Sequence, residues 1–200
     1  MSTHDKTAQQ RILEAVLDCI EQDGIQALTT REIAQAAGVN IASINYYFRS
    51  KDAAVAEALA MALKSMQEDV GAILADETIP FLSALEQVLD YLVQGAFLFP
   101  RTTMAHLYPA LMEGQYNTPV AQDMRAIVDG LAARWQHEHP GSDPAEARVA
   151  LAQIISMTVF VMLAPGFFAA SQPVDLTSPD GQRAYLRRLV QAYFPAPAGP

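Results

Sequence analysis

Apolar residues recur every three or four positions along most of the chain, which is the spacing of amphipathic helices. No series of alternating polar and apolar residues indicates a strand. The pattern therefore predicts an all-α fold of about nine helices. The expected helices lie near residues 7–23, 30–37, 41–48, 51–75, 81–99, 103–114, 120–138, 144–170 and 178–194.

Two of these helices, between residues 28 and 52, are unusually short. Thr29 precedes Glu32 by three residues, which is the spacing of a capping box, so the first short helix begins near Thr30. Gly38 ends that helix and Asn40 caps the next one. Helices of two turns are not stable alone in water, so they must pack on each other and on the stripe of the helix at 7–23. This arrangement predicts a helix-turn-helix, whose second helix enters the DNA major groove.

The remaining pattern divides the chain further. We expect a helix-turn-helix domain at 7–52, a linking helix at 51–75 that Ser50 caps, and a C-terminal helical domain at 76–194. Residues 1–6 and 195–200 are predicted to be disordered tails. The C-terminal domain is expected to bind an effector and to dimerise, on the resemblance described below.

Prolines set several of the expected boundaries. Pro100 should end the fifth helix, and Thr102 or Thr103 should then cap the sixth. Pro144 and Pro179 each follow a capping residue, at a position where a missing N–H has no cost.

The 26 residues from 149 to 174 hold no charged side chain, and that length would span a bilayer. Gln153, Ser156 and Thr158 lie in the middle of the run, and Pro165-Gly166 interrupts it. A helix that is apolar on all sides is otherwise one that is buried on several sides. We therefore favour a buried helix over a membrane span.

Charge and cysteine content modify this picture. The net charge is −9, and the first 55 residues hold five basic and seven acidic side chains, so DNA affinity must come from a few placed contacts and from dimerisation. The single cysteine, Cys19, suits a reducing compartment and is expected to be a packed thiol. Acidic residues run through the first 25 positions, so no export signal is predicted and we expect a cytoplasmic protein.

Residues 8 to 60 also resemble the TetR (tetracycline-repressor) family of bacterial regulators. The resemblance rests on Gly24, Thr29 to Arg31, Ile33-Ala34, Ala37-Gly38-Val39, Ile44, Tyr46-Tyr47-Phe48 and Lys51, which match in order. It implies a homodimer in which the last two long helices, near 145–170 and 178–194, pair with their counterparts in a four-helix interface. It also implies a C-terminal domain that binds a small effector.

The second short helix supplies the predicted DNA contacts. Asn40, Ala42, Ser43 and Asn45 are of the types that touch base edges. By resemblance, Thr30, Tyr46, Tyr47 and Lys51 match phosphate-contacting positions, and Arg31 matches one that reaches a base or a phosphate. The alternative is that the tyrosines only pack and that the polar residues are solvated. No Lys or Arg lies between Asn40 and Phe48, which argues against direct reading of guanine by this helix.

An apolar or amphipathic effector is expected among the fourth to eighth helices, where adaptable and aromatic side chains are frequent. His106 lies among apolar neighbours and is either a polar anchor for the effector or a histidine with a backbone partner. The candidate pocket residues are Met61, Met66, Phe97, Met104, His106, Tyr108, Met112, Met157 and Phe160.

The sequence contains no pattern that is typical of an enzyme or of a metal site. His137 and His139 are alternate residues, which point about 200° apart on a helix, so one ion does not easily take both and no metal site is predicted. No Ser/His/Asp spacing, glycine-rich phosphate loop or paired carboxylates stand out, so we predict neither an enzyme nor a cofactor.

The sequence thus predicts a DNA-binding transcriptional regulator, a ligand-responsive repressor that binds a palindromic operator as a homodimer. An activator or dual regulator is the first alternative, because operator position decides between them. The second is a helical ligand-binding protein with little DNA affinity, which the acidic balance favours.

Overall fold

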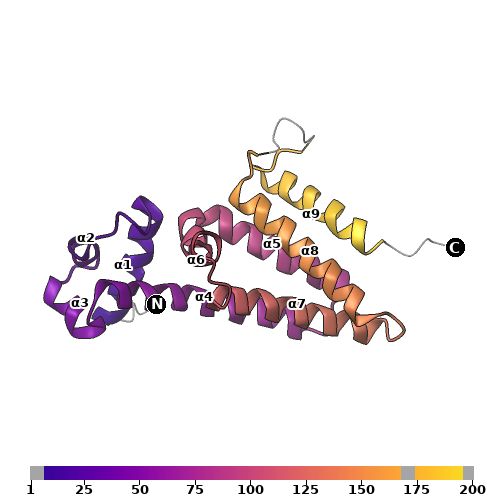
Figure 1. Ribbon diagram of the computed structural model, residues 1–200, viewed down its shortest axis with the longest axis horizontal. Helices are drawn as coiled ribbons and strands as arrows, with labels where there is room; N and C mark the ends of the chain where they lie inside the picture. Colours follow the sequence, from indigo (N-terminus) through magenta and orange to yellow (C-terminus); the bar gives the residue numbers. More distant parts are fainter. Residues whose placement is uncertain (1–6, 168–173, 196–200) are drawn as a thin grey trace, which may run out of the picture. The chain divides into compact units, whose positions relative to one another are not determined.

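The computed structural model describes residues 7–167 and 174–195, and within these residues every regular element is an α-helix (Figure 1). The predicted all-α fold is confirmed. The helices are α1 Ala8–Asp23, α2 Thr30–Ala36, α3 Ile41–Phe48, α4 Lys51–Ala75, α5 Phe81–Leu98, α6 Pro100–Glu113, α7 Pro119–Glu138, α8 Pro144–Leu163 and α9 Pro179–Tyr193. The predicted tails at 1–6 and 195–200 lie outside the described residues, apart from Pro195.

The chain divides into two compact units. The first contains the residues up to Met66 together with Phe99–Val120, and the second contains Gln67–Leu98 and the residues from Ala121 onward. Helix α4 therefore contributes to each unit, and α6 belongs with the N-terminal helices. The predicted domain boundaries, 7–52 and 76–194, remain predictions.

The core of the first unit forms where α1 meets α2 and α3. Ile12, Val16 and Ile20 of α1, Ile33 of α2 and Ile44 of α3 are fully buried in one apolar cluster. Burying an aliphatic side chain of this size contributes about 1.5–3 kcal/mol. This burial supplies the stability that helices of seven and eight residues lack by themselves.

The core of the second unit forms between α5, α8 and α9, which pack against one another. Phe81, Leu85 and Leu89 of α5 and Leu151 and Ile154 of α8 are almost completely buried. An aromatic cluster closes one end of this core. Phe81, Trp135 and Phe194 have ring centroids 4.8–5.1 Å apart, and His139 stacks on Trp135 at 3.6 Å.

Helix α8 is shorter than predicted. It ends at Leu163, with Ala164 as its C-cap, and not near residue 170. Pro165 explains the difference, because proline lacks an N–H and its ring disfavours the helical conformation of the residue before it. Residues 168–173 of the uncharged run lie outside the part that the structure describes.

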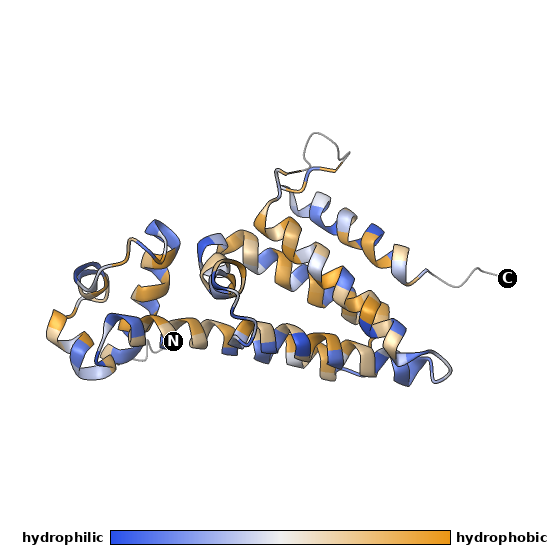
Figure 2. Ribbon diagram, viewed as in Figure 1, coloured by the Kyte–Doolittle hydropathy of each residue, from blue (hydrophilic) through white to orange (hydrophobic). Residues whose placement is uncertain are grey.

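Most of helix α8 is coloured as hydrophobic in Figure 2, and its apolar side chains include both buried and exposed ones. Leu151, Ile154 and Val161 face the core, whereas Val149 and Phe160 are 58% and 43% exposed. Among the described helices it is the single one whose length and composition would allow it to cross a bilayer, a test that core helices of soluble proteins also pass.

The predicted start of α6 was also wrong. Neither Thr102 nor Thr103 is the N-cap: the helix begins at Pro100, and Phe99 caps it without a side-chain hydrogen bond. The Thr102 hydroxyl and backbone N–H instead donate to the Glu21 carboxylate of α1, each at 3.0 Å. A carboxylate distant in sequence therefore takes the capping role.

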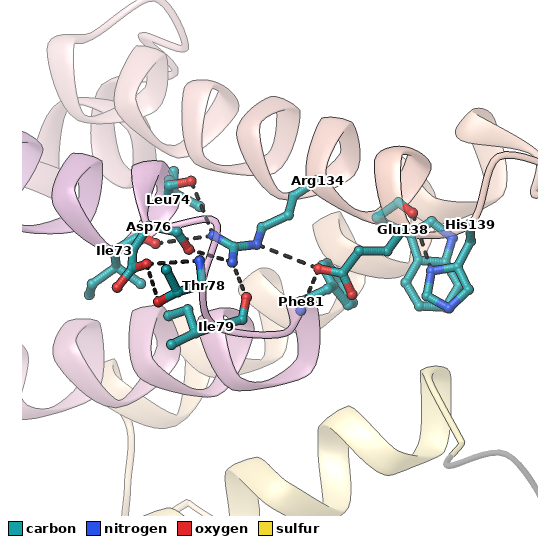
Figure 3. Close-up of polar contacts among 10 residues, drawn as sticks. Ile73, Leu74, Asp76, Thr78, Ile79, Phe81, Arg134, Glu138 and His139 are labelled. Atoms are coloured by element: carbon teal, nitrogen blue, oxygen red, sulfur yellow. Dashed lines mark hydrogen bonds and ion pairs between the residues drawn. The ribbon is translucent and has the colours of Figure 1, made fainter.

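Arg134 of α7 holds the connection between α4 and α5 (Figure 3). Its guanidinium donates to the carbonyl oxygens of Ile73 and Leu74, at the end of α4, and to those of Asp76 and Ile79 in the following turn. Its side chain is only 9% exposed. A cation here satisfies carbonyls that the helix end leaves without partners and opposes the helix dipole.

Further side chains fix the same connection. Glu138, one turn after Arg134, accepts a hydrogen bond of 2.8 Å from the backbone N–H of Phe81 at the start of α5. Between the helices themselves, the Tyr91 hydroxyl donates to Asp69 at 2.7 Å. Burial and this hydrogen bond raise the pKa of Tyr91 to about 12. Helices α4, α5 and α7 are thus joined by polar contacts as well as by apolar packing.

We expect Arg134→Met to lower the free energy of unfolding by about 2–3 kcal/mol, because it removes a charged donor from several carbonyls at once. Arg148→Met is the matched control. Arg148 pairs with Asp129 at 3.1 Å on the surface, so its loss should change stability by no more than about 0.5 kcal/mol. Urea unfolding followed by fluorescence of the single tryptophan measures these changes, and equal effects would contradict the assigned role of Arg134.

Candidate DNA-binding site

Helix α2 begins with a complete capping box. The backbone N–H of Thr29 donates to the Glu32 carboxylate at 2.9 Å, and the N–H of Glu32 donates to the Thr29 hydroxyl at 3.2 Å. Hydrogen bonds from the side chain and backbone of Thr29 lower the pKa of Glu32. The predicted capping role of these two residues is confirmed.

The turn between α2 and α3 depends on Gly38. Its φ of 62° lies in the left-handed region, where glycine carries no steric penalty. The N–H of Val39 then donates to the carbonyl of Ala34 at 3.0 Å, which closes the helix end. The chain leaves α2 sharply enough for α3 to pack against it.

Asn40 caps α3 as predicted. The capping hydrogen bonds join Asn40 to Ser43, and both residues are among the predicted DNA contacts. The Asn40 side-chain oxygen accepts from the backbone N–H of Ser43 at 2.8 Å and from its hydroxyl at 3.0 Å. The Ser43 side chain is half-buried. Asn40 itself is exposed.

Helix α3 separates its residues cleanly into two faces. Ile44 and Phe48 point into the core, whereas Ala42, Asn45 and Tyr46 are exposed, and Tyr46 reaches 82%. Tyr47 is also exposed, and its ring meets that of Tyr46 edge-on at 5.1 Å. A surface of this kind, near a helix N-terminus, is what major-groove recognition requires.

The other predicted contacts surround this helix in sequence. Thr30 and Arg31 are the first two residues of α2, and Thr30 is half-buried whereas Arg31 is exposed. Lys51 is half-buried, and its Nζ donates to the carbonyl oxygen of Leu28 at 2.9 Å. Lys51 therefore joins the start of α4 to the segment before α2, in addition to its predicted phosphate contact. All of these DNA contacts remain predictions.

Two exposed residues beside the predicted set were missed. Ile41, the first residue of α3, is 48% exposed. Arg49 follows α3 with φ = 67°, the one left-handed non-glycine residue in the described part of the chain. Arginine in this conformation costs roughly 1–2 kcal/mol relative to the usual helical region. No local sequence pattern indicated a positive φ at this arginine.

Helix α6 donates several hydrogen bonds to the end of α1. Glu21, in the last turns of α1, accepts from the backbone N–H groups of Arg101 and Thr102 at the start of α6. The Arg101 guanidinium in turn donates to the carbonyl of Gln22 near the end of α1. Each helix end thus receives a charge of the sign that its dipole favours. These contacts link residues about 80 positions apart, so no local pattern revealed them.

The predicted effector residues are divided between the two units. Of those in the first unit, Tyr108 accepts a hydrogen bond of 3.3 Å from Gln26, and Met61 packs against the apolar core. The effector pocket remains a prediction. Met61, Met66, Met104, His106, Tyr108 and Met112 lie in the first unit, and Phe97, Met157 and Phe160 lie in the second.

The capped helix pair, the glycine turn and the exposed face of α3 define a helix-turn-helix DNA-binding protein. Comparison with known proteins gives the family. Residues 12–58 match the sequence profile of bacterial regulatory proteins of the tetR family. The chain is therefore similar to this family over its helix-turn-helix, and the comparisons support a DNA-binding transcriptional regulator.

Similar proteins extend the likeness over most of the chain. The HTH-type transcriptional regulator BetI of Escherichia coli K12 is 25% identical over 159 residues, which cover 74% of this chain and 77% of BetI. A TetR-like regulator from Rhodococcus sp. RHA1 aligns with a TM-score of 0.69 at 15% identity, covering 94% of this chain and 97% of that one. The multidrug binding protein EbrR, complexed with malachite green, aligns with a TM-score of 0.62 at 27% identity, covering 90% and 96%.

Arg49 allows the charge and the backbone conformation to be tested separately. Arg49→Ala and Arg49→Gly each remove the guanidinium, so each should lower the salt dependence of DNA binding by about one unit if Arg49 contacts a phosphate. Only glycine suits a φ of 67°, so Arg49→Gly should be more stable than Arg49→Ala by about 1 kcal/mol. Thermal unfolding and salt titrations of binding measure the two effects, and an unchanged salt slope would remove Arg49 from the interface.

Proposed function

We propose that this regulator is a cytoplasmic, ligand-responsive repressor that binds a palindromic operator as a homodimer. The observation that carries the proposal is the set of hydrogen bonds between α1 and α6 at Glu21 and Arg101. Helix α6 bears four of the predicted effector residues, and α1 supports the recognition helix through their shared core. A ligand that displaces α6 therefore acts directly on the helices that bind DNA.

The homodimer is supported by the second face of α8. Val149, Met157 and Phe160 are each more than 40% exposed, although their helix carries no charge after Arg148. Apolar side chains gathered on one face of a soluble protein usually mark an interaction surface. In a two-fold dimer the same face of each protomer meets its counterpart, which agrees with the interface predicted at α8 and α9.

Dimerisation also compensates for the charge of the chain. A protein with a net charge of −9 gains little from a general electrostatic attraction to DNA. Two recognition helices spaced by about 34–36 Å enter successive major grooves together, so each protomer's few contacts are added to those of its partner. A palindromic operator is the sequence that matches this symmetry.

The proposed effector is apolar or amphipathic. EbrR, a multidrug binding protein that is 27% identical to this chain, has been crystallised in complex with malachite green. The methionine and aromatic side chains near α6 offer comparable contacts here, and His106 could orient a polar group of the ligand. A ligand that binds better when α4 or α6 is displaced changes the spacing of the recognition helices. A coupling of about 1–3 kcal/mol lowers DNA affinity roughly 5–150-fold.

A helical ligand-binding protein with little DNA affinity is the second candidate, because the chain is acidic and α3 carries no charged side chain. Activation in place of repression depends on where the operator lies relative to the promoter. A mobility-shift experiment with DNA upstream of the gene tests the main proposal. Salt-sensitive, sequence-dependent binding of a dimer supports it, and failure to discriminate between sequences favours the second candidate.

A charge introduced at Phe160 should break the homodimer. In Phe160→Asp a carboxylate would have to be desolvated in the apolar interface, so we expect monomers or aggregates in analytical ultracentrifugation. Leu111→Asp is the control, because Leu111 is 54% exposed but lies on α6 in the first unit. If Phe160→Asp sediments as a dimer like the control, the interface is not formed by this face of α8.

Ligand and operator should weaken each other by the same factor. Compounds selected by thermal shift are titrated against the protein with and without operator DNA. Operator DNA should lower the affinity for a true effector by the factor by which the effector lowers the affinity for DNA. A ligand whose affinity is unchanged by operator is not the effector. If no apolar or amphipathic compound from a broad screen binds, the sensor function should be abandoned.

A further inference from the structure

The exposed face of α3 carries methyl groups, the amide of Asn45 and the phenol of Tyr46, and it carries no charge. Ile41 is 48% exposed, Tyr46 is 82% exposed, and Ala42 and Asn45 are also exposed. We call Ile41, Ala42, Asn45 and Tyr46 the reading face. Ile41 and Ala42 lie four and three residues before Asn45, so the three are neighbours about 5–6 Å apart on the helix surface.

The side-chain oxygen of Asn40 and the hydroxyl of Ser43, at the start of α3, are engaged with each other. The Asn40 side-chain oxygen accepts two hydrogen bonds from Ser43, and the Ser43 hydroxyl donates one of them. Ser43 therefore cannot donate its hydroxyl proton to a base without giving up this bond. Asn45 is left as the exposed amide of α3, with a donor and an acceptor that the structure does not use internally.

The four base pairs present different groups in the major groove. Guanine offers two acceptors, which Arg or Lys reads best, and α3 contains neither residue. Adenine offers a donor and an acceptor that match the amide of Asn45. Thymine adds a C5-methyl group, which is matched by apolar side chains such as those of Ile41 and Ala42.

We propose that α3 reads A·T base pairs in its operator half-site. Ile41 and Ala42 contact thymine methyl groups, and Asn45 forms a paired hydrogen bond with adenine one or two base pairs away. Base pairs along a strand are 3.4 Å apart, so neighbouring side chains at 5–6 Å reach adjacent or next-adjacent pairs. Arg31 and Arg49, exposed on either side of α3 in the sequence, provide phosphate contacts and not base reading.

This inference rests on the DNA-binding function and specifies its target. A selection from random double-stranded DNA with the full-length protein tests it, and we expect half-sites with A·T pairs at the centre of each α3 footprint. Selection of half-sites with conserved G·C pairs there would overturn the inference while supporting the DNA-binding function. Failure to enrich any sequence would overturn the inference and the proposed repressor together.

Thymine methyl groups are tested by changing only the DNA. Replacement of a contacted thymine by uracil removes its methyl group and keeps the base pair, so we expect affinity to fall about 3–5-fold, the value of one buried methyl group. No change at any thymine of the half-site would overturn the methyl contact. Because the protein is unaltered, this result does not depend on the folding of a variant.

Variants then assign the contacts to residues. Ile41→Ala should bind thymine and uracil probes more equally than the unaltered protein, whereas Arg49→Ala should weaken binding of the two probes by the same factor. Asn45→Ala should lose about 5–150-fold on the selected site and tolerate other pairs at one position. Equal weakening of all sequences by Asn45→Ala would overturn its reading role. The thermal midpoint of each variant shows whether it is folded.

Discussion

The DNA-binding surface depends on the packing of two helices that are too short to exist alone. Helices α2 and α3 contain seven and eight residues, and their orientation comes from Ile33 and Ile44, which are buried completely against α1. The reading face of α3 is therefore only as well placed as this shared core. Capping adds precision, since Thr29 and Asn40 determine where each helix begins. A loss of core volume would be felt at the DNA surface before any contact residue changed.

The arrangement also explains why α6 belongs with the DNA-binding helices. Ala105 of α6 is buried in the same apolar cluster as Ile12 and Val16 of α1. The Glu21 carboxylate accepts from the backbone of α6, and the Arg101 guanidinium donates to a carbonyl at the end of α1. These hydrogen bonds hold the ends of the two helices together. Because packed helices shift as units, α6 and α1 respond together to any force on either one. A displacement of α6 can therefore reach the DNA-binding helices through α1, as well as through α4.

The fold was predictable where local signals determine it. Thr29, Asn40 and Ser50 each cap the helix that follows, and the apolar stripe of α1 forms the core as expected. The start of α6 was not predictable, because the group that satisfies its first N–H donors is Glu21, about 80 residues earlier. The end of α8 was misplaced for a different reason. The apolar pattern continues past Leu163 and predicts a longer helix, but Pro165 ends the helix at Leu163.

The candidate site shows the same division. Residue types and spacing were enough to place Ala42, Asn45 and Tyr46 on the exposed face of α3. They did not reveal that Asn40 and Ser43 bond each other, or that Lys51 donates to Leu28, since these bonds depend on rotamers and on tertiary packing. Arg49 was missed because nothing local requires a positive φ at an arginine.

In an acidic regulator with an uncharged recognition helix, the groups that attract DNA of any sequence differ from the groups that discriminate between sequences. Charged side chains near α3, such as Arg31 and Arg49, attract phosphates of any sequence, and salt weakens this attraction. Methyl and amide groups on α3 gain nothing from the phosphate field, and their contribution depends on complementary base edges. With a net charge of −9 the non-specific part is small, so a larger fraction of the binding free energy comes from the operator sequence. For the ligand-responsive repressor proposed above, this means little occupancy of random DNA when the operator is filled, and release by a modest change in the spacing of two helices.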